Sequence, residues 1–327
     1  MPYVSVIVPA YNAADFIVDS YLSVVDQTID DWEIIFVNDA SPDNTLKVLE
    51  SIAAADKRVK VIDLQSNSGP ACARNSGAAV AEGHWIAVLD ADDRYSPDRL
   101  EVLTRAGERN EADVVVDNQF VVDPISKAVV SPAFEPANGD AAILNFVDFL
   151  RNTQSNTLFD FGYLKPVIRR RWMVTNRIRY EEKLRVGEDL LFLLECYASG
   201  ARVMLVPNPH YYYYAQYSPV SRRRSPMSRT NENYGPMLAA TDAFREKYRS
   251  EQSDLEQRLL RSTREALHEA MLARALKAHL GQFDLIGLGF CLRNPVRILR
   301  GLYFEKRRGM LLRRQGKRRK QSRNELI

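Results

Sequence analysis

Short stretches of β-branched and apolar residues alternate with helical segments through the first 90 residues, and this alternation constrains the fold more than any other feature. We predict strands at 4–8, 32–37, 59–64 and 85–89, and helices at 14–25, 43–55 and 71–81. Strands that alternate with helices of this length are typical of a mostly parallel sheet joined by right-handed crossovers. The sequence therefore predicts an α/β fold with helices on both faces of the sheet.

Polar residues follow three of these strands at the point where each strand ends. The segment 9–12 follows the first strand, Asp39 follows the second, and the segment 90–92 follows the fourth. In open sheets of this kind, ligands bind beyond the carboxyl ends of the strands. We therefore expect the three polar segments to meet at one edge of the sheet and to form a binding site there.

Two carboxylates, Asp90 and Asp92, share one loop and are separated only by Ala91. Mg²⁺ and Mn²⁺ prefer oxygen ligands, and Mg²⁺ commonly joins one or two carboxylates to substrate phosphates. The spacing therefore predicts a Mg²⁺ or Mn²⁺ site on a phosphate-containing ligand, with Asp92 and Asp90 as the protein ligands. A solvated loop or a helix cap is the alternative interpretation of such a pair.

Four motifs in the same order resemble those of the family 2 glycosyltransferases, which are nucleotide-sugar-dependent enzymes with the Rossmann-like GT-A fold. They are SVIVPAYNA at 5–13, VNDAS at 37–41, NSGPACARNSG at 67–77 and LDADD at 89–93. A later segment, 179–192, fits the same family and extends the resemblance to about residue 220. Beyond it, the chain has a general likeness to bacterial exopolysaccharide transferases of the succinoglycan type.

The resemblance implies roles for the residues that follow the first two strands. It puts Tyr11 and the backbone around Pro9 against the nucleobase, with Asn12 in the same donor-binding loop. Asp39 would then form a hydrogen bond with the base or the ribose. Arg74 would approach the base or the neighbouring carboxylates, although on spacing alone it is equally well interpreted as a solvated arginine on a helix.

The resemblance also implies roles for the segment after the fourth strand. Asp90 would hold the ribose or a water molecule, Ala91 would lie in the same donor-binding loop, and Asp92 would ligate the metal ion on the diphosphate. The implied donor is a nucleotide sugar, with UDP as the expected nucleotide. Stabilisation of the departing diphosphate is the chemistry that a bound divalent ion supplies in such a reaction.

Transfer of a sugar also requires a group that removes the proton of the acceptor hydroxyl. Asp189 matches the base proposed for the family, and Glu188 is the competing candidate. The alternative for both is an acidic first turn of a helix, which the helix dipole favours. Direct displacement by the acceptor predicts an inverting reaction, in which an α-linked donor gives a β-glycosidic product.

The tyrosine run at 211–214 departs from the family pattern. Relatives often place an arginine after such a run, where it is thought to meet the diphosphate, but here Ala215 and Gln216 follow. We expect an arginine at 222–224 to replace it from a mobile loop that closes like a lid. The chain also lacks the Gln-x-x-Arg-Trp motif of processive synthases, which favours the transfer of one sugar per encounter.

Three regions are expected along the chain: a GT-A nucleotide-sugar-binding domain at 1–216, a helical region at 217–292, and a basic tail at 293–327. The tail holds 13 Lys and Arg residues against 2 Asp and Glu residues. Apolar residues alternate with these cations, which is typical of an amphipathic segment on an anionic membrane surface. A solvated, disordered tail is the alternative interpretation.

These features predict a nucleotide-sugar donor and a saccharide or lipid-linked saccharide acceptor, and no nucleic acid is expected as a partner. Three widely spaced cysteines favour a reducing compartment. The sequence contains no stretch of about 20 apolar residues, so we predict no membrane span. We therefore expect a cytoplasmic protein, either free or peripheral on the inner face of the cell membrane. Whether the predicted helix at 255–280 pairs with a second copy in a homodimer stays open.

Two other functions are alternatives to glycosyl transfer. A nucleotidyltransferase would also use a metal ion and this sheet, but it should carry a Gly-rich loop with a lysine after the first strand, and the segment 9–12 has neither. A nucleic-acid-binding protein acting through the basic tail would bind in a salt-sensitive manner. That function leaves the acidic clusters at the sheet edge unexplained.

Overall fold

The computed structural model describes residues 1–136, 139, 141–153, 160–214, 235–282 and 295–303. The chain divides into two compact units. The first, built from Met1–Val122, Pro132–Leu144 and Gly162–Ala215, contains the large sheet and every described residue of the expected site. The second takes its described residues from 123–131, 145–161 and 216–327 and is mainly helical.

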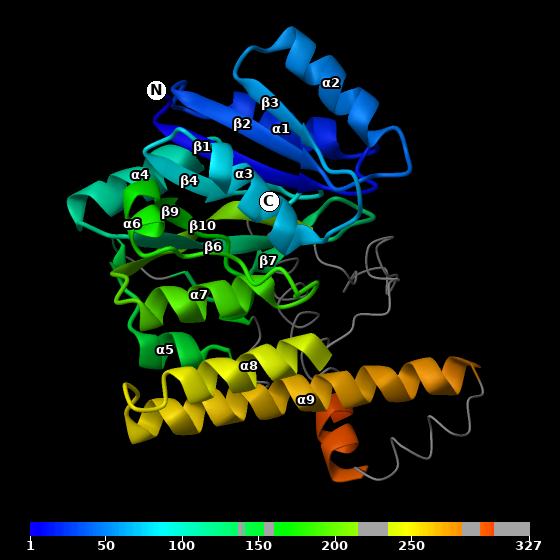
Figure 1. Ribbon diagram of the computed structural model, residues 1–327, viewed down its shortest axis with the longest axis vertical. Coiled ribbons are helices and arrows are strands. Elements are labelled where there is room, and N and C mark those ends of the chain that lie inside the picture. Colours follow the sequence, from blue (N-terminus) through cyan, green and yellow to red (C-terminus); the bar gives the residue numbers. More distant parts are fainter. Residues whose placement is uncertain (137–138, 140, 154–159, 215–234, 283–294, 304–327) are drawn as a thin grey trace, which may run out of the picture. The chain divides into compact units, whose positions relative to one another are not determined.

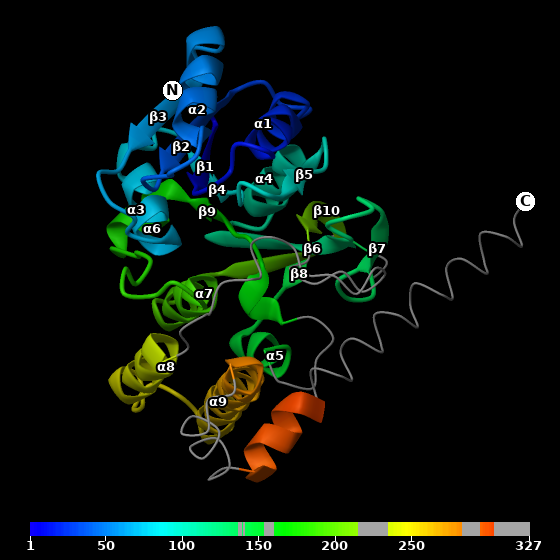
Figure 2. The same cartoon turned by 90° about the vertical axis from the view of Figure 1, so that its right-hand side faces the viewer.

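The sheet of the first unit has the strand order β3-β2-β1-β4-β9-β6-β10-β5. Figure 1 labels its strands from β3 to β10, and Figure 2 labels β5. The four predicted strands are confirmed as a parallel group: β1 (Val4–Ala10), β2 (Trp32–Asn38), β3 (Val59–Asp63) and β4 (Trp85–Val88). The other strands are β5 (Arg94–Tyr95), β6 (Val114–Val122), β8 (Ala142–Ile143), β9 (Val167–Arg169) and β10 (Val203–Tyr214). β7 (Val129–Pro132) spans the chain boundary between the two units.

A three-residue strand, β9, joins two parallel groups within the sheet. It is antiparallel to β4 on one side and to β6 on the other. Beyond it, β6 and β10 run parallel to each other, and β5 is antiparallel to β10. The sheet is therefore mixed in its second half, while the first half has the predicted parallel arrangement.

β10 is one continuous strand that contains both the apolar residues at 203–206 and the tyrosine run at 211–214. Its register with β6 shifts between Val206 and Pro209 and again between Pro209 and Tyr211. Because proline cannot donate a ladder hydrogen bond, an irregularity is needed to carry the strand past Pro207 and Pro209. The consequence is that the tyrosines belong to the sheet and reach its carboxyl edge.

Helices cover both faces of the sheet (Figures 1 and 2). α1 (Ile17–Val25), α2 (Thr45–Ala55) and α4 (Arg99–Arg109) pack in one cluster with Val6 and Val8 of β1. α3 (Pro70–Val80) packs on the opposite face, where a Cβ atom on Gly77 would lie 2.6 Å from Cγ2 of Ile7. Alternate residues of a strand point to opposite faces, so Ile7 faces α3 while its neighbours face α1. α6 (Arg170–Thr175) and α7 (Glu188–Ala198) are the remaining helices of this unit.

The second unit contains α5 (Phe146–Arg151), α8 (Gly235–Lys247), α9 (Asp254–Gln282) and a helix over 295–303, and the short η1 (Phe161–Tyr163) begins at its boundary. α9 confirms the helix predicted at 255–280. Thr153 and Thr263 share a buried hydrogen bond of 3.0 Å, and Arg264 binds Asp242 across α8 and α9 at 3.0 Å. In the part of the chain that the structure describes, none of the helices combines the length and apolarity that crossing a bilayer requires.

Candidate active site

The loops after β1 and β2 meet as predicted. The backbone N–H of Asp39 donates to the carbonyl of Ala10 at 2.9 Å, and the N–H of Asn12 donates to Oγ of Ser41 at 3.2 Å. Asn12 has a φ of 52°, a left-handed conformation that asparagine adopts more readily than most residues. Tyr11, beside it, is 39% exposed, so its ring is available to a ligand at this edge.

The carboxylate of Asp39 is held by the loop that precedes α3. Its Oδ1 accepts from the N–H of Ser68 at 2.6 Å, and its Oδ2 accepts from the N–H of Gly69 at 2.8 Å. Gly69 has a φ of 90°, a conformation that L side chains rarely adopt, so glycine suits this position. Asp39 therefore fixes the loop between β3 and α3, and each of its oxygens can accept one more hydrogen bond.

Arg74 is the centre of the site and brings together residues from three distant segments. Its side chain is 2% exposed, and its guanidinium contacts Asp90 Oδ1 at 2.7 Å, Glu188 Oε1 at 2.7 Å and Asp189 Oδ1 at 3.1 Å. Burial would lower the pKa of Arg74, but the attraction of the three carboxylates outweighs it and raises the pKa. The interpretation of Arg74 as a solvated arginine is therefore wrong.

A second buried cation, Lys165, was missed by the sequence analysis. Its Nζ lies 2.7 Å from Oδ2 of Asp90 and 2.6 Å from Oδ2 of Asp189, and its side chain is 5% exposed. Burial opposes the charged form of Lys165, yet the attraction of Asp189 and Asp90 raises its pKa. The available signal was a lone lysine between the apolar residues Leu164 and Pro166, in a segment for which no role was predicted.

The carboxylates of this network have different environments. Burial opposes the ionised form of Asp90, but Lys165 and Arg74 together hold its pKa well below the usual range. For Glu188, burial dominates over the attraction of Arg74, and its pKa is raised. Oδ1 of Asp189 accepts no hydrogen bond from any described residue, although it lies 3.1 Å from the Arg74 guanidinium.

Tyr211 and Tyr214 of β10 hold the loop that carries the two predicted metal ligands. The hydroxyl of Tyr211 donates to Oδ2 of Asp93 at 2.7 Å and accepts from the N–H of Asp90 at 3.2 Å. The N–H of Tyr214 donates to Oδ1 of Asp93 at 2.8 Å. Burial, together with the charges of Asp92 and Asp90, raises the pKa of Asp93. The tyrosine run therefore fixes the 90–93 loop against the edge of the sheet.

The two residues expected to ligate a metal ion, Asp90 and Asp92, have different surroundings. Asp90 has each carboxylate oxygen in contact with a cation, Oδ1 with Arg74 and Oδ2 with Lys165. Asp92 lies two residues further along the same loop and is partly exposed. Within the described ranges, no group of three or more His, Cys, Asp or Glu residues is arranged to hold a metal ion. This donor set fits a cation that takes a carboxylate from the protein and its other ligands from substrate phosphates and water.

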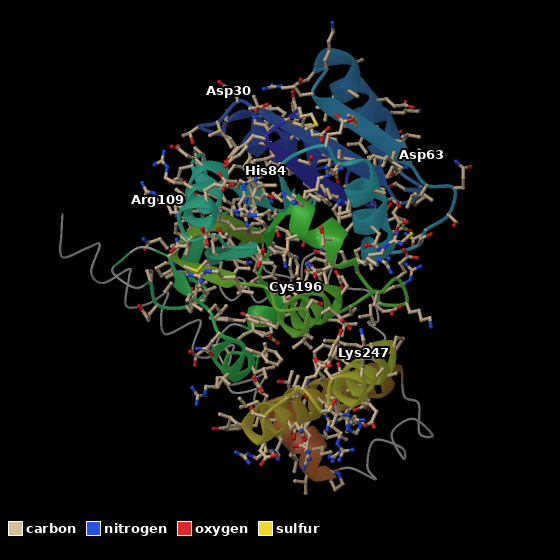
Figure 3. The ribbon with its side chains drawn as sticks, turned by 60° about the vertical axis from the view of Figure 1, so that its left-hand side comes forward. Asp30, Asp63, His84, Arg109, Cys196 and Lys247 are labelled. Atoms are coloured by element: carbon tan, nitrogen blue, oxygen red, sulfur yellow. The ribbon has the colours of Figure 1, made fainter. Side chains whose placement is uncertain are left out.

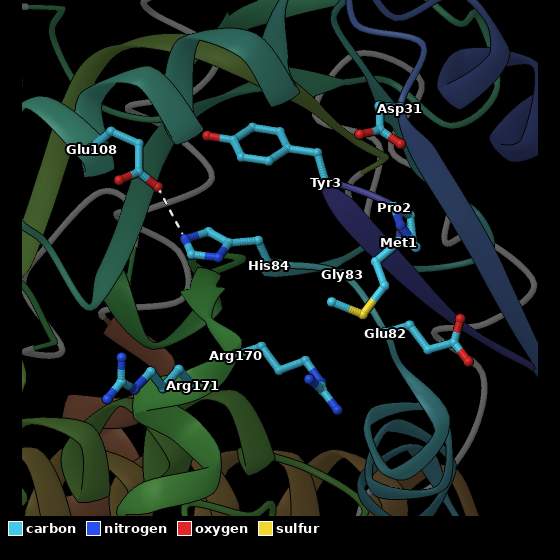
Figure 4. A pocket seen from close by; sticks show the side chains of 10 residues that line it. All are labelled: Met1, Pro2, Tyr3, Asp31, Glu82, Gly83, His84, Glu108, Arg170 and Arg171. Carbon is cyan, nitrogen blue, oxygen red and sulfur yellow. Dashed lines mark ion pairs between the residues drawn. The ribbon is translucent and has the colours of Figure 1, made fainter.

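A cavity of about 490 Å³ lies at the other end of the strands (Figure 4). Its lining includes Tyr3, His84, Arg170 and Arg171, and within it His84 pairs with Glu108 at 3.3 Å. Tyr3 and His84 directly precede β1 and β4, whereas the predicted site follows these strands. Figure 3 marks the two ends of the parallel group by His84 and by Asp63, the last residue of β3. The cavity is therefore separate from the site around Arg74.

The fold and the site together define a class of protein. It is an α/β protein whose sheet edge carries a buried cluster of carboxylates and cations beside the loop of the exposed Tyr11. A family model described as "Glycosyl transferase family 2" matches residues 5–169. The chain therefore belongs to glycosyltransferase family 2, and it is a glycosyltransferase.

Individual relatives agree with this assignment. The succinoglycan biosynthesis protein ExoO of Rhizobium meliloti is 35% identical over 285 residues, which cover 85% of this chain and 78% of ExoO. The uncharacterised glycosyltransferase EpsJ of Bacillus subtilis is 31% identical over 73% of this chain and 66% of its own length.

Among solved structures, residues 1–349 of TarS from S. aureus in complex with UDP-GlcNAc align with a TM-score of 0.62. The identity is 21%, and the alignment covers 85% of this chain and 73% of that one. A longer TarS structure aligns with a TM-score of 0.59, and the present chain spans 44% of it. These likenesses confirm the predicted GT-A type of fold.

Two sets of predictions concern residues outside the described ranges. The arginines at 222–224, expected to contact the diphosphate, lie in the undescribed segment 215–234. Most of the basic tail lies in the undescribed segments 283–294 and 304–327, and only its residues 295–303 are described.

Proposed function

We propose that this chain transfers a sugar from a nucleotide-diphosphate donor, expected to be a UDP-sugar, to a saccharide or lipid-linked oligosaccharide acceptor in bacterial polysaccharide biosynthesis. The observation that carries the proposal is the contact of one buried arginine, Arg74, with Asp90, Glu188 and Asp189. It unites the loop expected at the donor phosphates with the residues expected to act on the acceptor. The similarity to ExoO, named for succinoglycan biosynthesis, supports the class of product.

The donor is proposed to bind over the loops that follow β1, β2 and β4. Tyr11 offers an exposed ring for stacking on the base, with Pro9 and Asn12 in the same segment. Asp39, already bound to two backbone N–H groups, keeps acceptor capacity for an N–H of the base or a hydroxyl of the ribose. These contacts account for recognition of the nucleotide but leave the identity of the sugar to other residues.

We assign Mg²⁺ or Mn²⁺ to the loop of Asp90, Ala91 and Asp92, with Asp92 as the direct ligand. Asp90 would support the site through its two cations or join the ligands by exchanging its contact with Lys165. When bound, the divalent ion supplies Lewis-acid stabilisation of the diphosphate leaving group. The role of the chain is to hold the loop in place, which Tyr211 does through Asp93.

Asp189 is proposed as the general base, and Glu188 as the residue that fixes Arg74. Oδ2 of Asp189 is bound to Lys165, whereas Oδ1 lies 3.1 Å from the Arg74 guanidinium without accepting a hydrogen bond from a described residue, and it is the oxygen proposed to accept the proton of an acceptor hydroxyl. Glu188 uses Oε1 to accept a hydrogen bond of 2.7 Å from Arg74. Direct attack of the deprotonating hydroxyl on the anomeric carbon would invert its configuration.

The experiment is a panel of nucleotide sugars assayed for hydrolysis and transfer, with and without Mn²⁺. We expect one or a few donors to be turned over, with the wild type depending on the metal ion. Asp92→Asn should reduce turnover by roughly 100-fold or more, in the range typical for lost electrostatic stabilisation of a transition state. Asp31→Asn, an exposed change beside the cavity at the other end of the strands, is the matched control. Full activity of Asp92→Asn would contradict the assigned role of this loop.

Peripheral attachment to an anionic membrane is proposed for the end of the chain. In the helix at 295–303, Val296, Leu299 and Tyr303 are 68%, 66% and 58% exposed, and their spacing puts them on one helical face. Arg297 and Arg300 are exposed beside them, and the sequence beyond is rich in Lys and Arg. An apolar face flanked by cations is suited to an anionic bilayer surface.

Flotation with vesicles of phosphatidylglycerol or of phosphatidylcholine tests this attachment. The wild type should float with the anionic vesicles, and replacing Val296, Leu299 and Tyr303 by serine should reduce the bound fraction several-fold. The matched control replaces Val18 and Leu22, exposed apolar residues of α1, by serine. Equal flotation of the three proteins would refute the proposed contact.

A further inference from the structure

Lys165 links the two carboxylates that are expected to act on different substrates. Its Nζ lies 2.7 Å from Oδ2 of Asp90, in the donor loop, and 2.6 Å from Oδ2 of Asp189, the proposed base. Arg74 contacts the other oxygen of each of these two residues. Asp90 and Asp189 are therefore held by one pair of cations, each of which contacts both carboxylates.

The fold fixes Lys165 through its backbone as well as through its ammonium group. Arg99, the first residue of α4, donates from Nη2 to the carbonyl of Lys165 at 2.7 Å. The same guanidinium binds Asp117 of β6 through two hydrogen bonds, of 2.8 and 3.1 Å. Arg99 and Asp117 are both fully buried.

Such a buried ion pair is a costly way to fill space. Removing two charges from water is offset only by excellent geometry and by additional hydrogen bonds, so apolar residues would often pack as well. Arg99 has these additional contacts, because its guanidinium also lies over the rings of Tyr95 and Tyr211, at 4.3 and 5.2 Å. Tyr211 in turn holds the 90–93 loop, so the same buried assembly fixes both Lys165 and the donor loop.

The direction of the Lys165 contact determines which atom of Asp189 can react. Lys165 occupies Oδ2, whereas Oδ1 lies 3.1 Å from the Arg74 guanidinium and accepts no hydrogen bond from the described residues. A carboxylate that is free to rotate would offer either oxygen in many orientations, whereas the 2.6 Å contact of Oδ2 with Lys165, the shorter of the two cation contacts of Asp189, holds Oδ1 in one orientation. Reaction rates depend steeply on such alignment, because a misplacement of 1 Å can cost about 100-fold in rate.

We propose that Lys165 is a positioning residue for sugar transfer: it orients Asp189 so that Oδ1 faces the acceptor hydroxyl, and it sets the distance between this base and the donor loop. The inference rests on the proposed function, because it takes Asp189 as the base. It predicts that Lys165 acts on the chemical step through Asp189, and that its contribution to nucleotide affinity is small.

The test compares Lys165→Met with the wild type in two assays. Turnover with a saturating donor and acceptor measures the chemical step, and titration of UDP in the presence of Mn²⁺ measures nucleotide binding. We expect turnover to fall roughly 100-fold, the lower end of the range for a general base. The dissociation constant of UDP should change by less than about threefold, because the loss is confined to an interaction that acts in the transition state.

Lys60→Met is the matched control. Lys60 makes a similar contact, with Nζ 2.8 Å from Oε2 of Glu33, but it lies on β3 away from the site. We expect its turnover to equal that of the wild type. Lys165→Arg keeps the positive charge beside Asp90 and Asp189, so it should fold like the wild type and keep its UDP affinity. Because the shape of the side chain differs, its turnover should lie between that of Lys165→Met and that of the wild type. This variant keeps the test decisive if Lys165→Met does not fold.

A double-mutant cycle with Asp189→Asn separates positioning from a general structural role. If Lys165 acts through Asp189, adding Lys165→Met to Asp189→Asn should reduce turnover by less than about threefold further. Fully multiplicative losses, a parallel loss of UDP affinity, or a Lys165→Met enzyme as active as the wild type would each overturn the inference. Failure of the wild type to use any nucleotide sugar would instead refute the proposed function.

Discussion

Replacing Arg99 by methionine tests how much of the stability of the sheet unit depends on one buried ion pair. Methionine replaces the aliphatic part of the arginine side chain with an unbranched apolar chain, but it removes the guanidinium that contacts Asp117. It leaves an uncompensated carboxylate in a fully buried position, and it leaves the carbonyl of Lys165 without the 2.7 Å hydrogen bond. Both consequences destabilise the folded state.

The magnitude follows from the burial of the pair. Removing one partner of a buried ion pair costs about 3–5 kcal/mol, since the remaining charge has no counter-ion. A domain has a free energy of unfolding of about 5–15 kcal/mol, so the loss is a large fraction of the total. Urea unfolding followed by tryptophan fluorescence measures it, since Trp32 and Trp85 are buried in the same unit.

Arg105→Met in the same helix is the control. Arg105 is 58% exposed and pairs with Glu101 one turn away, so this change should cost about 0.5 kcal/mol or less. The double variant Arg99→Met with Asp117→Leu should regain most of the stability, because an apolar pair of suitable volume can replace a buried ion pair. Equal destabilisation by Arg99→Met and Arg105→Met would contradict the predicted cost of breaking this buried ion pair.

Three other predictions concern stability and the donor loop. Burial raises the pKa of Glu33, but its bonds to a lysine, a serine and a backbone N–H outweigh burial and lower that pKa. Its stabilising contribution is therefore fully present above its unfolded-state pKa of about 4.3 and is lost as the pH falls through its lowered folded-state pKa. In urea titrations, the advantage of the wild type over Glu33→Gln should be complete at pH 6 and should shrink progressively as the pH falls below about 4.3. Gly107→Ala puts a Cβ atom 2.4 Å from the ring of buried Trp85. We expect this overpacking to cost about 1–3 kcal/mol and to lower the urea midpoint, because it outweighs the better helix propensity of alanine. Tyr211→Phe removes the hydroxyl that donates to Asp93. It should lower the free energy of unfolding by about 1–3 kcal/mol, measured by thermal unfolding, and it should weaken UDP binding. Unchanged stability and unchanged UDP affinity would contradict the assigned role of this hydroxyl.

The first half of the fold could be predicted because its signals are local. Each strand of the parallel group is an apolar stretch, each ends at polar residues, and Pro70 and Gly69 mark the start of α3. Because the carboxyl ends of parallel strands lie at one edge of the sheet, the loops that follow them could be placed together without any knowledge of distances. The roles of Asp39 and Arg74 came from the family resemblance, and the structure adds that both are buried and held by specific partners.

The second half could not be predicted because its determinants are distant in sequence. α4 was missed because its buried face includes Arg99 and Thr104, which hide the apolar periodicity. The continuity of β10 could not be predicted because its strand passes Pro207 and Pro209 through irregularities that only the pairing with β6 defines. Lys165 is 75 residues from Asp90 in sequence, so no local pattern could reveal their contact.

The antiparallel strand β9 has a consequence for the order of folding during synthesis. β4 pairs with β1 on one edge and with β9 on the other. β4 ends at Val88, but β9 begins only at Val167, about 80 residues later. At a translation speed of about 5–20 residues per second, the open edge of β4 would wait roughly 4–16 s for its partner to emerge. An unpaired edge of apolar residues is a template for wrong pairing. The nascent chain is therefore vulnerable to aggregation in that interval, and a holding chaperone that acts during it should improve the yield of folded enzyme.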